Sequence, residues 1–178
     1  FFGSMMKTWA ITDVGLVRKE NQDAYRIARG GDVCVVCDGM GGAAGGQIAS
    51  TLAAETYAAE LEKILKPAMT PEQLRASEDD ELSNMGTTLV SAIAYEGGVV
   101  VTNVGDSRAY YITRAGITRI TKDHSLVESM VDHGDITADE ARHHPSRNLI
   151  TRALGRDTNA SCDGYIRPME KGVYLLLC

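Results

Sequence analysis

The chain has 178 residues, of which 44% are hydrophobic and 24% charged, a balance that favours one globular domain with a buried core. Eighteen Lys and Arg residues against 24 Asp and Glu residues give a formal net charge of −6. This charge disfavours nucleic acid as a partner, because phosphate backbones attract clustered basic residues. No apolar run reaches the roughly 18 residues that span a bilayer, so we expect no membrane partner.

The first half of the chain is predicted to contain two strands and a long helix. Short apolar runs at residues 7–12 and 33–37 predict core strands, and apolar residues at helical spacing predict a helix over residues 47–65. Residues 67–84 combine prolines with an acidic run. That composition predicts a mobile surface connection.

The second half is predicted to begin with an antiparallel meander. Over residues 87–121, runs of β-branched and aromatic residues alternate with glycine-containing turns. Residues 125–133 and 137–143 have a helical period, with Thr137 as the N-cap of the second helix. The ending GVYLLLC predicts another core strand. Because strands follow one another and helices stand apart, we expect an α+β fold, with a doubly wound sheet as the alternative.

The four cysteines do not suggest a disulfide framework in a chain of this length, so we expect a reducing, cytoplasmic location. Cys34 and Cys37 have C-x-x-C spacing, but they lie in an apolar run where residues three apart point to opposite faces. Burial is therefore favoured over metal or redox chemistry. Residues 1–5 (FFGSM) look like a remnant of cloning, which leaves residues 6–178 for a single domain.

Aspartates recur where apolar strands end or in tight loops. A carboxylate held at the edge of a core is a ligand that Mg²⁺ and Mn²⁺ prefer, so several converging carboxylates would form a cation site. Aspartate is also common in turns, where it caps neighbouring N–H groups, and these residues alone leave both interpretations open. The candidates are Asp13, Asp23, Asp38, Asp106 and Asp123.

The stretch after Asp38, GMGGAAGG, is the most unusual part of the sequence. Gly39 and the glycines that follow allow positive φ angles and a close backbone approach, so that a carbonyl could face an ion. An ordinary strand-to-helix turn is the alternative. A phosphate-binding loop is disfavoured, because the stretch lacks the G-x-x-x-x-G-K-[ST] pattern.

Arg18 lies five residues before Asp23 and has two interpretations. Its planar guanidinium could bind a phosphate through two parallel hydrogen bonds, or it could form a surface ion pair with Glu20. The spacing gives no catalytic role to the histidines at positions 124, 143 and 144.

Six stretches in this order resemble the PPM family, the metal-dependent type 2C protein serine/threonine phosphatases, and in particular its bacterial branch. The resemblance runs from about Thr8 to Cys178, apart from the acidic connection. It implies a two-sheet antiparallel β-sandwich flanked by helices, with Mn²⁺ or Mg²⁺ ions at one end. The stretches are TDVGLVRKENQDAY, VCDGMGG, MGTTLV, TNVGDSRAYYI, ITKDHSLV and HHPSRNLITRALG.

The resemblance also implies roles for single residues. Asp38 would bridge two metal ions, Gly39 would offer its carbonyl to one of them, and Asp23 would hold metal-bound water. Asp106 would help to hold a third, looser ion, and Arg18 would bind the substrate phosphate. Arg18 and Asp38 are thus the expected catalytic residues, and a metal-activated water would attack phosphoserine or phosphothreonine directly. Residues 125–147 would form a flap that influences substrate choice.

Three departures from the family pattern bear on activity. Met40 stands where many eukaryotic members have a histidine, so no general acid is assigned there. Residues 66–85 are too short and polar for the second long helix of the family. After YLLLC the family continues with Ser-Asp-Gly and later Asp-Asn, which carry metal ligands. We therefore expect weak metal binding and slow or absent turnover, and association through an exposed, unpaired strand at residues 173–178.

The expected substrate is a phosphoprotein, phosphorylated by a bacterial serine/threonine kinase. A non-catalytic PPM-like module that binds a phosphoprotein, or an inactive fragment, is the alternative from another class. A nucleotide-binding α/β domain built on the glycine-rich loop is a third interpretation, and it requires parallel strands.

Overall fold

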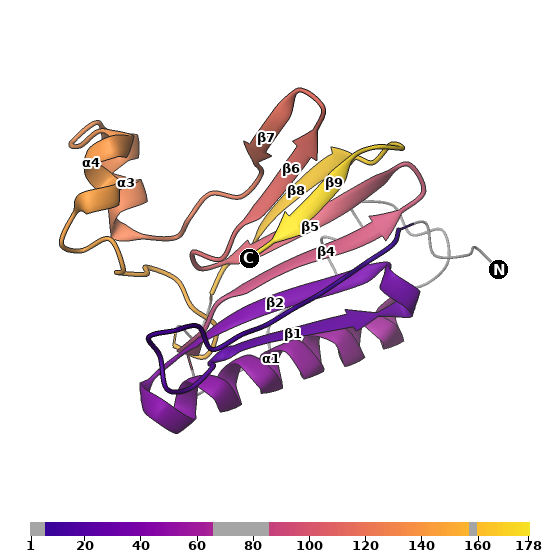
Figure 1. Cartoon of the computed structure of the whole chain (residues 1–178), viewed down its shortest axis with the longest axis horizontal. Coiled ribbons are helices and arrows are strands. Elements are labelled where there is room, and N and C mark those ends of the chain that lie inside the picture. The colour runs from indigo at the N-terminus through magenta and orange to yellow at the C-terminus, as the bar shows by residue number, and fades with distance from the viewer. Residues whose placement is uncertain (1–5, 66–85, 157–159) are drawn as a thin grey trace.

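A computed structural model describes residues 6–65, 86–156 and 160–178 (Figure 1). The predictions for residues 1–5 and for the connection at 67–84 lie outside these residues. The elements in chain order are β1 (Asp23–Ala28), the 3-10 turn η1 (Arg29–Gly31), β2 (Val33–Met40), α1 (Gly42–Ile64), β3 (Gly86–Thr87), β4 (Leu89–Tyr95), β5 (Gly98–Val104), β6 (Ala109–Thr113), β7 (Gly116–Arg119), α3 (Leu126–His133), α4 (Ala138–His143), β8 (Asp163–Pro168) and β9 (Tyr174–Leu177).

The strands form two sheets, and each strand pair in the described residues is antiparallel. The larger sheet has the order β1-β2-β4-β5-β8, with β3 beside β2, and the smaller has the order β7-β6-β9. Val90 and Val101 of the larger sheet share a buried cluster with Ala109 and Leu177 of the smaller one. The predicted α+β sandwich is confirmed, whereas a doubly wound sheet and a nucleotide-binding domain would need parallel strands.

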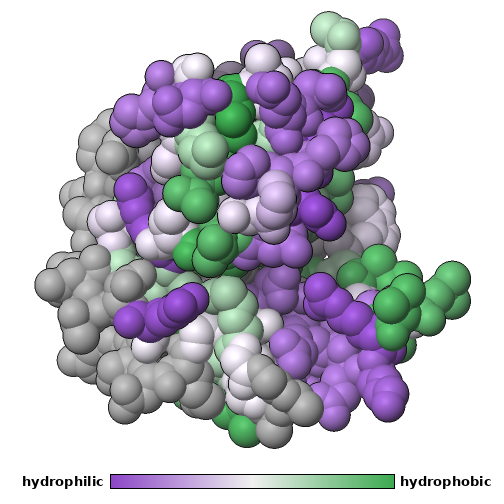
Figure 2. Space-filling view, turned by 90° about the vertical axis from the view of Figure 1, so that its left-hand side faces the viewer, coloured by the Kyte–Doolittle hydropathy of each residue, from purple (hydrophilic) through white to green (hydrophobic). Residues whose placement is uncertain are grey.

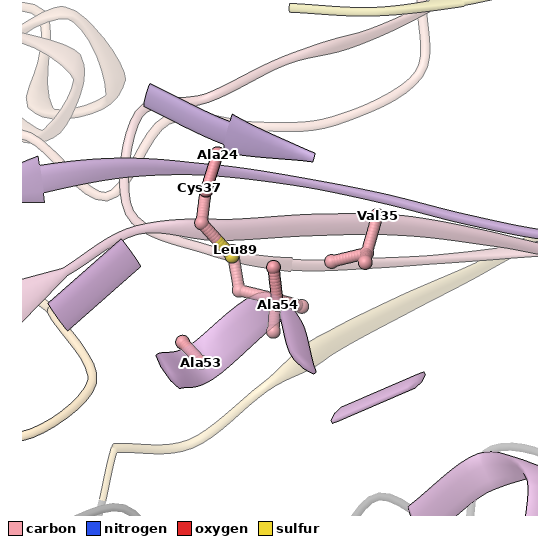
Figure 3. Close-up of a cluster of buried hydrophobic side chains, with 6 residues drawn as sticks. All are labelled: Ala24, Val35, Cys37, Ala53, Ala54 and Leu89. Carbon is pink, nitrogen blue, oxygen red and sulfur yellow. The ribbon is translucent and has the colours of Figure 1, made fainter. Parts of the chain in front are cut away.

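Helix α1 covers the outer face of the larger sheet (Figure 1). Its alanines meet Val35, Cys37 and Leu89 in a buried cluster (Figure 3). Small side chains on α1 let the helix approach the strands closely, so each buried apolar atom gains contacts. The cluster comprises Ala24, Val35, Cys37, Ala53, Ala54 and Leu89.

The two N-terminal cysteines lie on opposite faces of β2, as predicted. Cys37 is fully buried against α1, and burial raises the pKa of its thiol to about 12. Cys34 is half-buried, and its Sγ lies 3.8 Å from the carbonyl oxygen of Gly31. A thiol with a raised pKa stays protonated at neutral pH and is a poor nucleophile or ligand.

A chain of buried hydroxyl groups fixes α1 to the sheet. Tyr57 Oη of α1 lies 2.6 Å from Ser91 Oγ of β4, which lies 2.7 Å from Thr102 Oγ1 of β5. Ser91 and Thr102 are fully buried. Because buried hydroxyls are costly without partners, this chain favours one position of the helix over neighbouring ones.

The strand predicted for residues 7–12 is wrong. No strand forms there, and Trp9 and Ile11 are 80% and 93% exposed. Alternating apolar residues favour a strand only where a neighbouring strand takes up the backbone hydrogen bonds and covers the side chains. Asp13 follows in a turn, where its Oδ1 accepts a hydrogen bond from the Gly15 N–H at 2.8 Å.

The C-terminal strand β9 is paired on one side, so the prediction that it is unpaired is wrong. It runs antiparallel to β6, with Leu177 opposite Ala109. Leu175 and Leu177 pack between the sheets, whereas Tyr174 and Leu176 are exposed. Its other edge has no strand beside it within the described residues. Association through that edge stays a prediction.

The two short helices are confirmed, and they extend from the sandwich as a pair (Figure 1). Ser125 caps α3, and Gly134, with φ of 78°, ends it. Thr137 caps α4 in a capping box with Glu140, as the sequence predicts. Among the described helices, none has the length and apolar character needed to cross a membrane.

Candidate functional site

The candidate site lies where β1 begins and where β2 and β5 end. The register of β1 and β2 places Asp23 directly opposite Asp38. Such pairs have Cβ atoms roughly 5 Å apart on one face of the sheet. Because β4 runs antiparallel to both β2 and β5, these two strands end at the same edge, and Asp106 follows β5 there.

Electrostatics place four predicted residues in one neighbourhood. The pKa of Asp38 is raised to about 6, first by burial and then by the charge of Asp23 and a hydrogen bond with its carboxyl group. Arg18 opposes this shift, and the charge of Asp106 adds to it. Burial also raises the pKa of Asp106, as does the charge of Asp123. The structure thus brings together Arg18, Asp23, Asp38 and Asp106.

The backbone of Asp38 is fixed by two threonines. The Asp38 N–H donates to Thr88 Oγ1 at 2.9 Å, and its carbonyl accepts from the Thr88 N–H and from Thr87 Oγ1, each at 3.0 Å. Both threonines are buried. Sequence reasoning found their motif, MGTTLV, but gave them no role, because hydroxyl partners 50 residues apart leave no local pattern.

Of the two properties predicted for Gly39, positive φ and a close backbone approach, the structure shows the close approach. Positive φ is found at Gly41, with 124°, and not at Gly39. A Cβ atom on Gly39 would overlap the backbone carbonyl of Gly46, since the first turns of α1 pass directly over the end of β2. The glycine therefore permits close packing of α1 on the strand. That its carbonyl faces an ion stays a prediction.

Asp123, another candidate carboxylate, forms an ion pair instead. Arg108 Nε lies 2.9 Å from Asp123 Oδ1, and Arg108 Nη2 lies 2.5 Å from Oδ2. The hydrogen bond to Asp123 raises the pKa of Arg108. A bidentate guanidinium occupies both oxygens of this carboxylate, so Asp123 supports the loop after β5 and is poorly placed to bind a cation.

Sequence reasoning missed a polar cluster behind Asp106. Buried His124 accepts the Gly105 N–H at Nδ1, 3.0 Å away, so Nε2 carries the proton and donates to Asp163 Oδ2, also at 3.0 Å. Arg152 Nη1 donates to Asp163 Oδ1 at 3.1 Å. His124 thus links the Asp106 loop to β8. The partners are about 20 and 40 residues apart in sequence, so spacing alone does not reveal them.

Figure 2 views the molecule from the end that carries the site, where hydrophilic residues cover much of the described surface. Asp23 and Asp38 fit a hard divalent cation in their chemistry, since two carboxylates that repel each other are stabilised by a positive charge between them. Across residues 6–65, 86–156 and 160–178, however, no three His, Cys, Asp or Glu side chains group into a metal site. The carboxylates in the described residues could therefore bind only a cation that retains several water molecules among its ligands.

Comparison with known proteins agrees with this geometry. Residues 17–171 match the protein phosphatase 2C family. The serine/threonine phosphatase stp of Listeria innocua is 34% identical over 186 residues, which cover 94% of this chain and 74% of that protein. The crystal structure of a bacterial serine phosphatase superposes with a TM-score of 0.80 at 37% identity, over 94% of this chain and 75% of the other.

A third similar structure contains metal. The catalytic domain of the serine/threonine protein phosphatase PstP, in complex with two manganese ions, has a TM-score of 0.71 and 30% identity, over 92% of this chain and 72% of that one.

A two-sheet antiparallel sandwich with paired carboxylates at one end defines the class of metal-dependent phosphatases, and this chain belongs to the protein phosphatase 2C family. Within the family it is a bacterial serine/threonine protein phosphatase, a hydrolase that acts on phosphoproteins.

Proposed function

We propose that this phosphatase acts in the cytoplasm on proteins phosphorylated by a bacterial serine/threonine kinase, and that the reaction takes place at the Asp38 end of the sandwich. The observation that carries the position of the site is the electrostatic neighbourhood of Arg18, Asp23, Asp38 and Asp106. Asp23 and Asp106 both raise the pKa of Asp38, and such repulsion between acidic groups costs stability unless a cation offsets it.

In this proposal the acidic residues bind the cations and the basic residue Arg18 binds the substrate phosphate. Asp38 would hold the divalent cations, Mn²⁺ or Mg²⁺, Gly39 would contribute a carbonyl, and Asp23 would hold water bound to the cations. Asp106 would help to hold a third, looser ion. When bound, the cations supply a water of lowered pKa and neutralise the phosphoryl oxygens. Arg18 is exposed, so its guanidinium can reach a phosphate on the surface of a protein and donate two parallel hydrogen bonds to it.

The helix pair α3–α4, within the predicted flap of residues 125–147, influences substrate choice in this proposal. It extends from the sandwich at the end that carries the site (Figure 1). The Leu126 N–H donates to the Leu149 carbonyl at 2.9 Å, so the two ends of the flap are fastened together. A substrate protein that presents its phosphate to Arg18 would lie beside these helices.

We further infer that the 178-residue polypeptide binds metal weakly. Two facing carboxylates are few ligands for a divalent cation, and the described residues form no group of three. Weak metal binding lowers turnover, because the nucleophilic water depends on the cation.

Calorimetric titration with Mn²⁺ tests the site, with Asp38→Asn and Glu96→Gln as matched acid-to-amide variants. Glu96 lies exposed in the turn between β4 and β5, at the other end of the sheet. We expect binding weaker than submicromolar, lost in Asp38→Asn and unchanged in Glu96→Gln. Equal binding by both variants would place the metal elsewhere. Submicromolar affinity would contradict the inferred weakness.

Phosphate release from a phosphothreonine peptide separates the enzyme from a non-catalytic binding module. Slow release that requires Mn²⁺ and is lost in Asp38→Asn supports the proposal. Peptide binding with no release at saturating Mn²⁺ would favour the binding module.

A further inference from the structure

Asp38 and Asp106 lie on two separate segments. Asp38 lies near the end of β2, and Asp106 lies in the loop after β5, with β4 between these strands in the sheet. Their relative position therefore depends on what joins the two segments. If Asp38 and Asp106 hold neighbouring ions, small changes in their separation would change the affinity for both.

Thr88 contacts both segments through one oxygen atom. Its Oγ1 accepts the Asp38 N–H at 2.9 Å and lies 2.6 Å from Ser107 Oγ, one residue beyond Asp106. A hydroxyl group has two lone pairs and one proton, so it can hold both partners at once. Thr88 is fully buried and Ser107 is 7% exposed, so water does not compete effectively for these bonds.

The other atoms of Thr88 reinforce the same connection. Its N–H donates to the Asp38 carbonyl at 3.0 Å, so Thr88 holds both polar backbone groups of Asp38. On the opposite side, a Cβ atom added to Gly105 would lie 2.7 Å from Thr88 Cγ2. The loop that carries Asp106 thus packs tightly against the methyl group of the residue whose hydroxyl holds Asp38.

We propose that the Thr88 hydroxyl is a positioning group that sets the separation of Asp38 and Asp106. It acts through the Asp38 backbone on one side and through Ser107 on the other, and it touches neither substrate nor cation. The proposal rests on the proposed function only where it assumes that Asp38 and Asp106 hold neighbouring ions. The bridge that Thr88 Oγ1 forms between the Asp38 N–H and Ser107 Oγ is a property of the folded chain.

The test uses variants that separate the hydroxyl group from the methyl group. Thr88→Val keeps the shape and removes the oxygen, Thr88→Ser keeps the oxygen and removes the methyl, and Ser107→Ala removes the second partner. Thr118→Val, at an exposed position of β7, is the matched control. Hydrogen exchange and amide spectra by NMR are recorded for each 178-residue variant without metal.

We expect Thr88→Val to speed exchange of the Asp38 amide roughly tenfold, the loss of one hydrogen bond, and to shift the amide signals of residues 105–107. Ser107→Ala should shift the Asp38 signal in return, and Thr88→Ser should restore protection. The amide of Val35 in the middle of β2 should be unchanged, because a merely structural defect would accelerate exchange throughout the sheet.

The proposal is refuted if the amide signals of residues 105–107 move no more in Thr88→Val than in the control Thr118→Val. Thr88 would then hold Asp38 without affecting the loop that carries Asp106. Should Thr88→Val not fold, the effect of Ser107→Ala on the Asp38 amide decides the question. A Mn²⁺ titration of the same set tests the functional part: affinity should fall roughly tenfold in Thr88→Val relative to Thr88→Ser. Absence of Mn²⁺ binding in every variant would count against the proposed function and leave the exchange result intact.

Discussion

Asp38→Asn is expected to stabilise the metal-free protein at neutral pH. The Asp38 carboxyl is partly buried, and it faces the carboxyl of Asp23 across the β1–β2 pair. Ionisation of Asp38 in the folded state is therefore unfavourable, and its pKa is raised from the ordinary 3.8 to about 6. Asparagine has a similar shape and no charge, so it removes the repulsion while it keeps the strand pairing.

The sign and size of the effect follow from proton linkage. Below pH 3.8 the group is protonated in both folded and unfolded chains and contributes nothing. Between 3.8 and about 6 the folded chain holds the proton more tightly, so stability falls as the pH rises. A pKa rise of this size corresponds to about 3 kcal/mol if fully realised. Because the carboxylate keeps part of its hydration, we expect about 1–2 kcal/mol at neutral pH.

Urea unfolding measures this difference, in a chelating buffer and at several pH values from below 3.8 to neutral. Wild type and Asp38→Asn should be similar in acid and diverge as the pH rises, with Asn the more stable. Glu96→Gln, far from the site, should follow the wild type. If Asp38→Asn were no more stable than wild type at neutral pH, Asp38 would be well solvated, and the argument that it awaits a cation would fail.

Two further substitutions test the packing that positions the site. Gly39→Ala should cost about 3 kcal/mol or more, because the new Cβ overlaps the Gly46 backbone; Gly45→Ala, with open space around it in the same helix, should be neutral or stabilising by up to about 1 kcal/mol. Equal thermal stability of the two variants would contradict the close approach of α1. Tyr57→Phe should cost about 1 kcal/mol by urea unfolding, since Ser91 keeps its bond to Thr102; an unchanged midpoint would mean that the Tyr57 hydroxyl contributes nothing.

The local pattern of the sequence determined much of the fold. The apolar run of residues 33–37, the helical spacing after Gln47 and the capping box at Thr137 each depend on residues a few positions apart. The same holds for the position of Asp38 in the sequence, because this carboxylate directly follows the apolar run of residues 33–37. For these features the physical cause lies within the segment itself.

Only the tertiary structure decided how distant segments meet. In the folded chain residues 7–12 have no strand partner, Asp123 forms an ion pair with Arg108, and the Thr88 hydroxyl lies between Asp38 and Ser107. Each outcome depends on a partner that is distant in the sequence. A hydrogen bond between residues 19 or 50 positions apart produces no periodic pattern from which it could be predicted. The sequence by itself thus determined which charged residues are candidates for the site at this end of the sandwich. Pairing of the strands decided which of those charges face one another, because side-chain contacts follow from register.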